Sequence, residues 1–282
     1  MYPQLIDTHT HVHFAAYKGD MDEVIKRSLD EGIGMITVGT QSSTSKKAIE
    51  VAEKYDGVWA TVGLHPSHLH KQEFNDDNEF DPGKIKTRTE EFDPEYYREL
   101  VSHPKVVAVG EFGLDFYHKP RNVEESKVIE DQTAATNLQI DFATEFNKPI
   151  VVHCRDAHDL QYEVLKRAVD EGKLPRRGVV HCFTGSLEDA RRYIELGFMI
   201  SFTGILTFSD EIQRIAKELP MESIMIETDA PYLSPAPNRG KRNEPSFVKH
   251  IAHVLADIKG MSYKEVAEQT TKNAIEFFQL DM

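Results

Sequence analysis

The stretch 5-LIDTHTH-11 begins with a short apolar run and ends in two histidines that are two residues apart. The same plan recurs in 151-VVHC-154 and 179-VVHC-182, where a β-branched run leads directly into a histidine. Short apolar runs of this kind predict buried strands. Each of these strands would therefore carry a histidine at its C-terminal end.

Eight such runs occur along the chain, at residues 5–9, 35–39, 58–64, 106–110, 150–153, 179–181, 199–202 and 224–227. The segments between them have helical periodicity, as in Val128, Ala135, Phe142 and Phe146. Strands that alternate with helices form parallel sheets. Dividing 282 residues by eight gives about 35 per unit, the size of one βα repeat of a barrel.

We therefore predict an α/β fold, a (β/α)8 TIM-like barrel that forms a single domain over residues 1–282. A doubly wound open sheet is the alternative, but it would not naturally use eight near-equal units. The helix signals agree with the barrel, since Asp93-Pro94 predicts an N-cap and Ser262 with Glu265 predicts a capping box. No stretch has the length or composition of a linker between two domains.

One segment interrupts the alternation, the polar stretch of residues 73–91, with seven acidic and three basic residues. It follows the third predicted strand, so in a barrel it would be a loop inserted on the C-terminal face, where active sites of this fold lie. It could form a lid or a wall for a substrate, or it could be a solvated insertion with no role.

The overall charge excludes a uniformly basic surface, because 33 Lys and Arg stand against 47 Asp and Glu, a net charge of −14. Any contact with nucleic acid must therefore be local. The 40% hydrophobic and 28% charged residues are typical of a soluble globular protein.

The two cysteines, Cys154 and Cys182, cannot form a disulfide framework and fit a cytoplasmic protein. Alternation along a strand would turn both thiols toward the helices, away from the neighbouring histidines. No apolar run approaches the roughly 20 residues of a membrane helix, and residues 1–7 do not resemble a signal peptide. We expect no membrane association and no obligate protein partner.

Six residues of the kinds that bind metals fall at the predicted C-terminal strand ends: His9, His11, Glu111, His153, His181 and Asp229. A parallel barrel gathers these ends on one rim. Taken singly, each has a structural explanation, but four histidines and two acids in one cavity without cations would be unfavourable to bury.

Six ligands are more than one zinc ion takes, so we predict two divalent metal ions. Mixed imidazole and carboxylate ligands suit Zn, Mn, Fe or Co better than Mg alone. His13 could join His9 and His11 if the strand continues that far, and Glu227 could orient a ligand.

Substrate contacts are expected from rim residues beside these ligands. His65 ends the third strand, Arg155 follows His153, and Arg239 belongs to a basic loop with Lys241 and Arg242. His118, Lys119 and Arg121 follow the fourth strand in the same way. Aromatic residues at this end could stack on unpaired bases, or could simply pack: Phe112, Phe116, Tyr117, Phe183 and Tyr232.

The ordered motifs of the chain resemble the TatD family of metal-dependent deoxyribonucleases, which are amidohydrolase-like barrels. The motifs are LIDTHTH at residues 5–11, GEFGLD at 110–115, VHCRDA at 152–157, HCFTGS at 181–186, ETDAPYL at 227–233 and RGKRNEP at 239–245. The resemblance implies a two-metal centre that hydrolyses DNA phosphodiester bonds, trimming single strands from the 3′ end.

Carried over residue by residue, the resemblance implies that His9, His11, Glu111 and Asp229 bind one metal. Glu111 would bridge to a second metal, which His153 and His181 complete. The chain departs from the family pattern in two places: His13 stands where the family commonly has Asp or Asn, and the segment 73–91 is longer than expected. Both departures concern substrate preference.

We expect a metal-activated hydroxide to attack the phosphorus, with Asp229 as both ligand and general base and Glu111 as the second catalytic residue. The same centre could instead perform acyl chemistry, as an amidohydrolase or an aminoacyl-tRNA deacylase. A metal-binding interaction module without catalysis is the third possibility.

Overall fold

The computed structural model describes residues 3–74 and 85–281. Its main sheet consists of eight strands that pair in parallel in sequence order. These are β1 (Leu5–Thr10), β2 (Ile33–Val38), β3 (Val58–Val62), β6 (Val106–Asp115), β7 (Ile150–Arg155), β8 (Gly178–Val180), β9 (Met199–Phe202) and β10 (Ile224–Ile226). The eight predicted strands are confirmed, and β6 is five residues longer than predicted.

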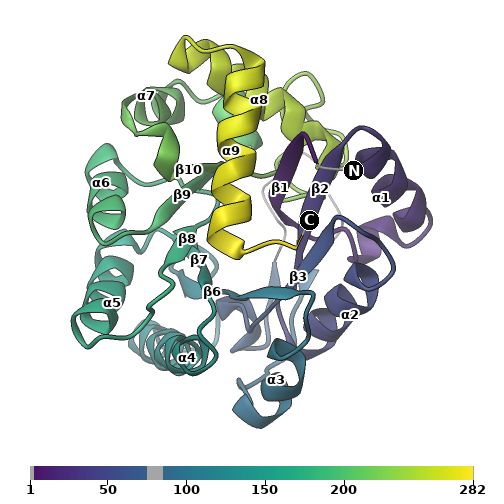
Figure 1. Ribbon diagram of the computed structural model, residues 1–282. Helices are drawn as coiled ribbons and strands as arrows, with labels where there is room; N and C mark the ends of the chain where they lie inside the picture. The colour runs from purple at the N-terminus through teal and green to yellow at the C-terminus, as the bar shows by residue number, and fades with distance from the viewer. Residues whose placement is uncertain (1–2, 75–84, 282) are drawn as a thin grey trace.

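The strands are surrounded by helices, as Figure 1 shows. The helices are α1 (Met21–Asp30), α2 (Ser42–Ala52), α3 (Pro94–Val101), α4 (Glu125–Glu145), α5 (His158–Asp170), α6 (Leu187–Glu195), α7 (Asp210–Glu218), α8 (Val248–Lys259) and α9 (Tyr263–Phe278). No helix within the described ranges is both long enough and apolar enough to cross a membrane.

The last strand returns to the first, which nearly closes the sheet into a barrel. The residues that follow β10 pair with the end of β1 through a bridge between Thr10 and Ala230. Two backbone bonds continue this seam: His11 N donates to Ala230 O at 2.7 Å, and Asp229 N donates to His9 O at 2.8 Å. The structure is therefore a (β/α)8 barrel and not the doubly wound open sheet. This seam also joins the motif at residues 5–11 to the motif at residues 227–233.

The hydrophobic core has two layers because side chains alternate along each strand. The larger layer lies between the strands and the helices. The smaller layer fills the barrel at its N-terminal end and includes Ile6, Trp59, Val107, Val151, Val179 and Met225, the second residue of each of six strands. Phe278 and Leu280, at the end of the chain, belong to the same cluster. The N-terminal half of the barrel is thus packed with apolar groups, and in Figure 1 α9 runs toward the middle of the ring of strands.

Both predicted helix starts are present. The Asp93 carboxylate accepts from Glu95 N at the start of α3, and Ser262 and Glu265 form the capping box of α9. These caps satisfy backbone donors that would otherwise lack partners in the first turn.

The inserted segment of residues 73–91 contains a short antiparallel ladder, β4 (Glu73–Phe74) with β5 (Ile85–Lys86). Residues 75–84 lie outside the described residues. The C-terminal end of the segment is fixed to the rim, since Glu90 N donates to His68 O and the Glu90 carboxylate accepts from Ser42 N, both at 2.8 Å. The described residues of the segment do not line the cavity of the site, so a role as lid or wall stays a prediction.

Candidate metal centre

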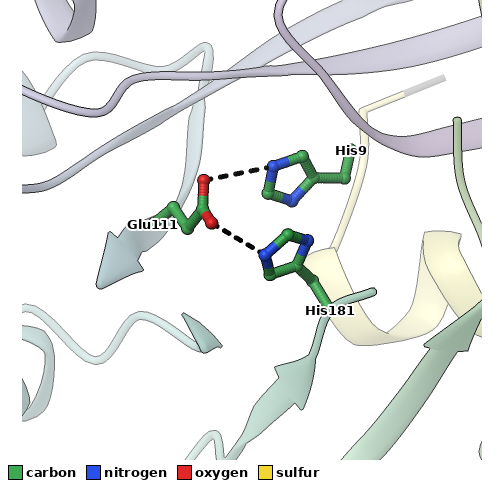
Figure 2. A group of neighbouring side chains, drawn as sticks. All are labelled: His9, Glu111 and His181. Atoms are coloured by element: carbon green, nitrogen blue, oxygen red, sulfur yellow. Dashed lines mark ion pairs between the residues drawn. The ribbon is translucent and has the colours of Figure 1, made fainter. Parts of the chain in front are cut away.

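The six predicted ligands converge at the C-terminal mouth of the barrel, and Glu111 stands between them. Its carboxylate Oε2 lies 3.4 Å from His9 Nε2, and its Oε1 lies 2.7 Å from His181 Nε2. Figure 2 shows these two oxygens, each directed at one imidazole. The two rings are stacked, with centroids 4.0 Å apart. The carboxylate therefore divides the ligand atoms into two groups.

The first group surrounds Glu111 Oε2. His11 Nε2 lies 3.8 Å from this oxygen and 3.2 Å from His9 Nε2. Asp229 Oδ1 lies 3.3 Å from His11 Nε2 and 3.7 Å from His9 Nε2. His9, His11 and Asp229 thus face one another at a spacing that a shared cation would bridge, and Glu111 Oε2 lies beside the two imidazoles.

The second group surrounds Glu111 Oε1. His153 Nδ1 lies 2.9 Å from this oxygen, and His181 Nε2 lies 3.4 Å from His153 Nδ1. His65 joins this group, because its Nε2 lies 3.4 Å from Glu111 Oε1. The sequence placed His65 among the substrate contacts, whereas the structure places it within reach of the ligand cluster.

This donor set fits divalent metal ions. In each of three overlapping sets the ligand atoms lie within 4.8 Å of one another, and each set combines imidazoles with a carboxylate: His9 with Glu111 and His181, His9 with His11 and Asp229, and His65 with Glu111 and His153. That combination is used by Zn, Mn, Fe and Co sites. Burial would disfavour so many charged and polar groups in the absence of a cation. Residues from opposite sides of the barrel thus form a site that is suited to metal.

A bulge in β1 directs its histidines into the mouth. Asp7–Thr10 of β1 lie opposite Met35–Thr37 of β2, so β1 carries one extra residue there. β1 ends at Thr10, so His11 lies just beyond the strand, and the rings of His9 and His11 are inclined by 80°. A bulge re-aims side chains, and both Nε2 atoms reach the cluster through it. His13 does not join them, since its Nδ1 bonds Thr37 Oγ1 at 2.7 Å instead.

A second bulge places Glu111. Val109–Phe112 of β6 lie opposite Ile150–Val152 of β7, again with one extra residue. Gly110 and Gly113 flank the carboxylate with φ of 147° and 149°, values that L side chains rarely adopt. A Cβ on Gly113 would also lie 2.0 Å from His153 O. The glycines of this motif are therefore required by the path of the backbone beside Glu111.

Two buried carboxylates contact the ring nitrogens of His153 and His181 that face away from Glu111. Asp115 Oδ2 lies 3.0 Å from His153 Nε2 and 2.9 Å from His118 Nδ1. Glu227 Oε1 accepts from Cys182 N at 2.6 Å and lies 3.3 Å from His181 Nδ1. Partners of this kind fix the orientation of a ligating imidazole. The sequence identified Glu227 in this role but missed Asp115 and His118.

The electrostatics of the site keep the central carboxylate ionised. Burial acts to raise the pKa of Glu111, but the surrounding imidazoles of His181, His65 and His9 hold its pKa well below the usual range. For His9, burial and the neighbouring His181 lower the pKa. An ionised carboxylate beside a neutral imidazole is the protonation state that metal binding requires.

The pKa of His153 is shifted in the opposite direction to that of His9. Burial lowers its pKa, but hydrogen bonds to Asp115 and Glu111 outweigh burial and raise the pKa to about 8. At neutral pH a cation at this position would therefore displace a proton from the imidazole.

The cluster opens into a cavity of about 390 Å³. Its wall includes five of the six predicted ligands, all except the fully buried His9, together with Phe14, Thr40, Ser67, His68, Arg155, Thr184, Ile205, Tyr232 and Leu233. Arg155 is the cation of this wall, and its guanidinium lies 3.8 Å from the centre of the Tyr117 ring. The cavity therefore offers a positive group beside the ligand cluster.

The basic loop of residues 239–245 is only partly available for substrate. Arg239 lies outside the cavity wall, with its guanidinium 3.6 Å from the centre of the Phe208 ring. Arg242 donates to both carboxylate oxygens of Asp20, at 2.8 and 2.5 Å, so its charge is already compensated. The expectation that the basic loop offers Arg242 to a substrate is wrong for this reason. Lys119 is likewise paired, with Glu125 at 2.7 Å.

The two cysteines differ in burial and in backbone conformation. The Cys154 thiol is buried, 3.3 Å from His158 Nδ1 of α5, as strand alternation predicts. Cys182 has a φ of 44°, is less buried and contacts Thr203. The prediction that its thiol turns toward the helices from a strand is wrong, because β8 ends at Val180.

A barrel with such a cluster at its C-terminal mouth defines the class, a metal-dependent hydrolase. The family model described as TatD related DNase matches residues 6–279. The chain therefore belongs to the TatD family, and it is a hydrolytic enzyme that uses divalent metal.

Individual relatives agree with this assignment. The chain is 37% identical to YabD of Bacillus subtilis, described as an uncharacterized metal-dependent hydrolase, over 98% of this chain and 100% of that protein. It is 33% identical to the 3′-5′ ssDNA/RNA exonuclease TatD of Erwinia billingiae, over 98% and 99% of the two chains. The crystal structure of YjjV, a TatD homologue from Escherichia coli, superposes with a TM-score of 0.84 at 29% identity over 100% of both chains.

Proposed function

We propose that this enzyme is a two-metal phosphodiesterase that removes nucleotides from the 3′ ends of single-stranded DNA. One observation carries the proposal: the two oxygens of Glu111 face two separate groups of ligand atoms. A carboxylate with one oxygen toward each group could hold two cations side by side, and paired cations would stabilise the attacking and leaving oxygens of an in-line displacement at phosphorus.

His9, His11 and Asp229 would hold one cation, His153 and His181 the other, and Glu111 both. Bound cations would supply Lewis-acid activation of water and stabilise charge on the phosphate oxygens. Asp229 is the least buried carboxylate of the cluster, with 16% of its side chain exposed, so it can meet a water molecule at the cavity. The Asp229 carboxylate would accept the proton of the attacking water, and His11, whose Nδ1 lies 2.8 Å from Val38 O, would offer Nε2 to the same cation.

Arg155 and Tyr117 would bind the substrate beside the ligand cluster. The Arg155 guanidinium lines the cavity and can donate to a phosphate, while Tyr117 is 45% exposed and can stack on an unpaired base. A base can reach the ring only when it is unstacked, which favours single strands. His65, near Glu111 Oε1, would contact the same phosphate.

Three features support a nucleic-acid substrate over acyl substrates. The cavity has a guanidinium on its wall, exposed aromatic rings stand beside it, and the relative from Erwinia billingiae is named for activity on single-stranded DNA and RNA. The barrel fold by itself does not distinguish phosphodiester from acyl substrates, because amidohydrolases have the same fold.

The test is a substrate panel given to metal-replete protein: DNA and RNA oligonucleotides labelled at either end, a duplex, a lactone, a cyclic amide and misacylated tRNA. We expect stepwise shortening of 5′-labelled single-stranded DNA. Loss of label from the 5′ end first would contradict the polarity. Turnover of the amide or the tRNA without cleavage of any oligonucleotide would contradict the phosphodiesterase assignment.

A further inference from the structure

The wall of the cavity has two sides that differ in polarity. Among the described residues, the large apolar side chains of the wall all follow β9, β10 and β1, which are neighbours in the nearly closed barrel. We call them the apolar side: Ile205 after β9, Tyr232 and Leu233 after β10, and Phe14 after β1. The wall residues after the other strands are polar or charged, apart from the two cysteines. The ligand cluster lies between these two sides.

Phe14 is held against the ligand cluster. Its ring stacks on the His11 ring, with centroids 4.4 Å apart and planes inclined by 17°. The His13 ring meets it edge-on at 4.9 Å. The turn that carries Phe14 is fixed by a bond from Phe14 N to His11 O at 2.9 Å. The ring is only partly buried, so the surface that the two imidazoles leave uncovered belongs to the cavity wall.

The loops that carry Ile205 and Leu233 are packed on each other. A Cβ on Gly204 would lie 2.0 Å from Leu233 O, so the turn that holds Ile205 lies directly on the backbone of the loop after β10. That loop is also held by the fully buried Asn243, whose Nδ2 donates to Tyr232 O at 2.6 Å. The apolar side is therefore a fixed part of the fold.

The chemistry of the apolar side matches a nucleobase. Phe14, Ile205 and Leu233 offer carbon surfaces that can pack on a flat ring. None of these three side chains has a hydrogen-bonding atom, so they can hold any base but cannot read its edges. A phosphate would be a poor occupant, because a charged group would lose its hydration there without gaining a partner. The phosphate fits the opposite side, where Arg155 lines the cavity.

We propose that the apolar side of the cavity is a pocket for the base of the terminal nucleotide, in which Phe14 and Ile205 contact the base. The strand would then leave the cavity past Arg155. The proposal rests on the proposed function and deepens it, because it states how the end of the strand is recognised. The enzyme would require a base at the end that it cleaves, but it would not require a particular base.

The test uses three decanucleotides of single-stranded DNA. One is unmodified, and the others carry an abasic tetrahydrofuran residue at the 3′ end or at the 5′ end. For the parent protein, KM should be about 5- to 140-fold higher with the 3′-abasic strand, as expected for the loss of one stacked base at roughly 1 to 3 kcal/mol. The 5′-abasic strand should have the same KM as the unmodified strand.

Substitutions on the apolar side should act only through the base. Phe14→Ala and Ile205→Ala should raise KM for the unmodified strand and leave KM for the 3′-abasic strand nearly unchanged. Phe14→Trp should restore the ratio of the two KM values. Ile258→Ala is the matched control and should change neither KM, because Ile258 is a partly buried isoleucine on α8, outside the cavity wall. A substitution that merely displaced His11 would affect both strands alike, and an unchanged ratio in Phe14→Ala and Ile205→Ala would overturn the pocket.

Binding of phosphorothioate versions of the strands, which resist cleavage, distinguishes this proposal from the proposed function. If no strand is cleaved, but the parent binds the unmodified strand more tightly than the 3′-abasic strand and Phe14→Ala removes the difference, the pocket stands and the proposed function is wrong. If the parent cleaves all three strands with equal KM, the pocket is wrong and the proposed function stands. Dependence on the 5′ base instead would support the pocket and contradict the 3′ polarity. A parent that binds none of the strands overturns both proposals.

Discussion

Asp115 Oδ2 lies 3.0 Å from Nε2 of His153, and this contact decides which nitrogen of His153 faces the metal centre. With Nε2 engaged, Nδ1 is left 2.9 Å from Glu111 Oε1. Asp115 is itself held by the backbone N–H groups of Tyr117 and His118, at 2.9 and 2.8 Å. A loop that begins at the end of β6 therefore sets the orientation of a ligand on β7.

Asp115→Asn should weaken metal binding. The amide can present only its oxygen or its NH₂ group to His153, so the ring is held less firmly, and such changes typically reduce metal affinity by about 10- to 100-fold. The measurement is competition with a chelator of known affinity. Asp170→Asn is the control, since Asp170 is an exposed acid on α5 paired with Lys166. Equal affinities of both variants and the parent would show that Asp115 has no such role.

Asp229→Asn should lower kcat by about 10²- to 10⁴-fold, the range for removal of a general base. KM should change little, because Arg155 and Tyr117 are untouched. The variant should fold normally, since Asn tolerates the φ of 55° that Asp229 adopts. Single-turnover kinetics on a labelled oligonucleotide provide the measurement, and a variant as active as the parent would exclude Asp229 as the base.

Glu111→Gln should reduce the number of bound ions from the proposed two to one or none. The neutral amide cannot offer two anionic oxygens, so the two groups of ligands lose their shared member. Elemental analysis after metal-replete purification gives the stoichiometry. Two retained equivalents in the variant would contradict the bridging role.

Phe278→Ala should destabilise the barrel by about 3 to 5 kcal/mol, because it removes a buried aromatic ring from the cluster inside the strands. Phe277→Ala is the matched control and should have a smaller effect, since Phe277 is only partly buried. The single tryptophan, Trp59, belongs to the same cluster and reports unfolding by its fluorescence during denaturant titration. Equal losses in the two variants would contradict this account of the core.

Neither cysteine should react quickly in the native protein at pH 8. Burial raises the pKa of Cys154 to about 12 and raises the pKa of Cys182 well above its usual value, so the reactive thiolate is scarce at that pH. The rate should rise as pH rises toward these values. A colorimetric thiol reagent should detect both groups only after denaturation, and rapid labelling of the folded protein at pH 8 would contradict this expectation.

Much of the site followed from the strand pattern, because parallel strands of a barrel must end at one rim. That rule brought His9, Glu111, His153 and His181 together without any knowledge of distances. The same rule failed for Asp115, since the predicted strand stopped at Gly110 while the real strand passes through a bulge and continues to Asp115. Arg242 was misjudged for another reason: its partner Asp20 is 222 residues away, and only folding brings the two together.

By itself the sequence determined the order of strands and helices, the barrel and the kinds of residues at its mouth, because these depend on local periodicity and on the closure of a parallel sheet. Tertiary structure alone decided which atoms meet. The two bulges are register shifts of a single residue. The orientation of His153 and the division of ligands between the oxygens of Glu111 depend on distances between individual atoms. A pattern of residue types carries no information at that scale, whereas hydrogen bonding and coordination are decided by it.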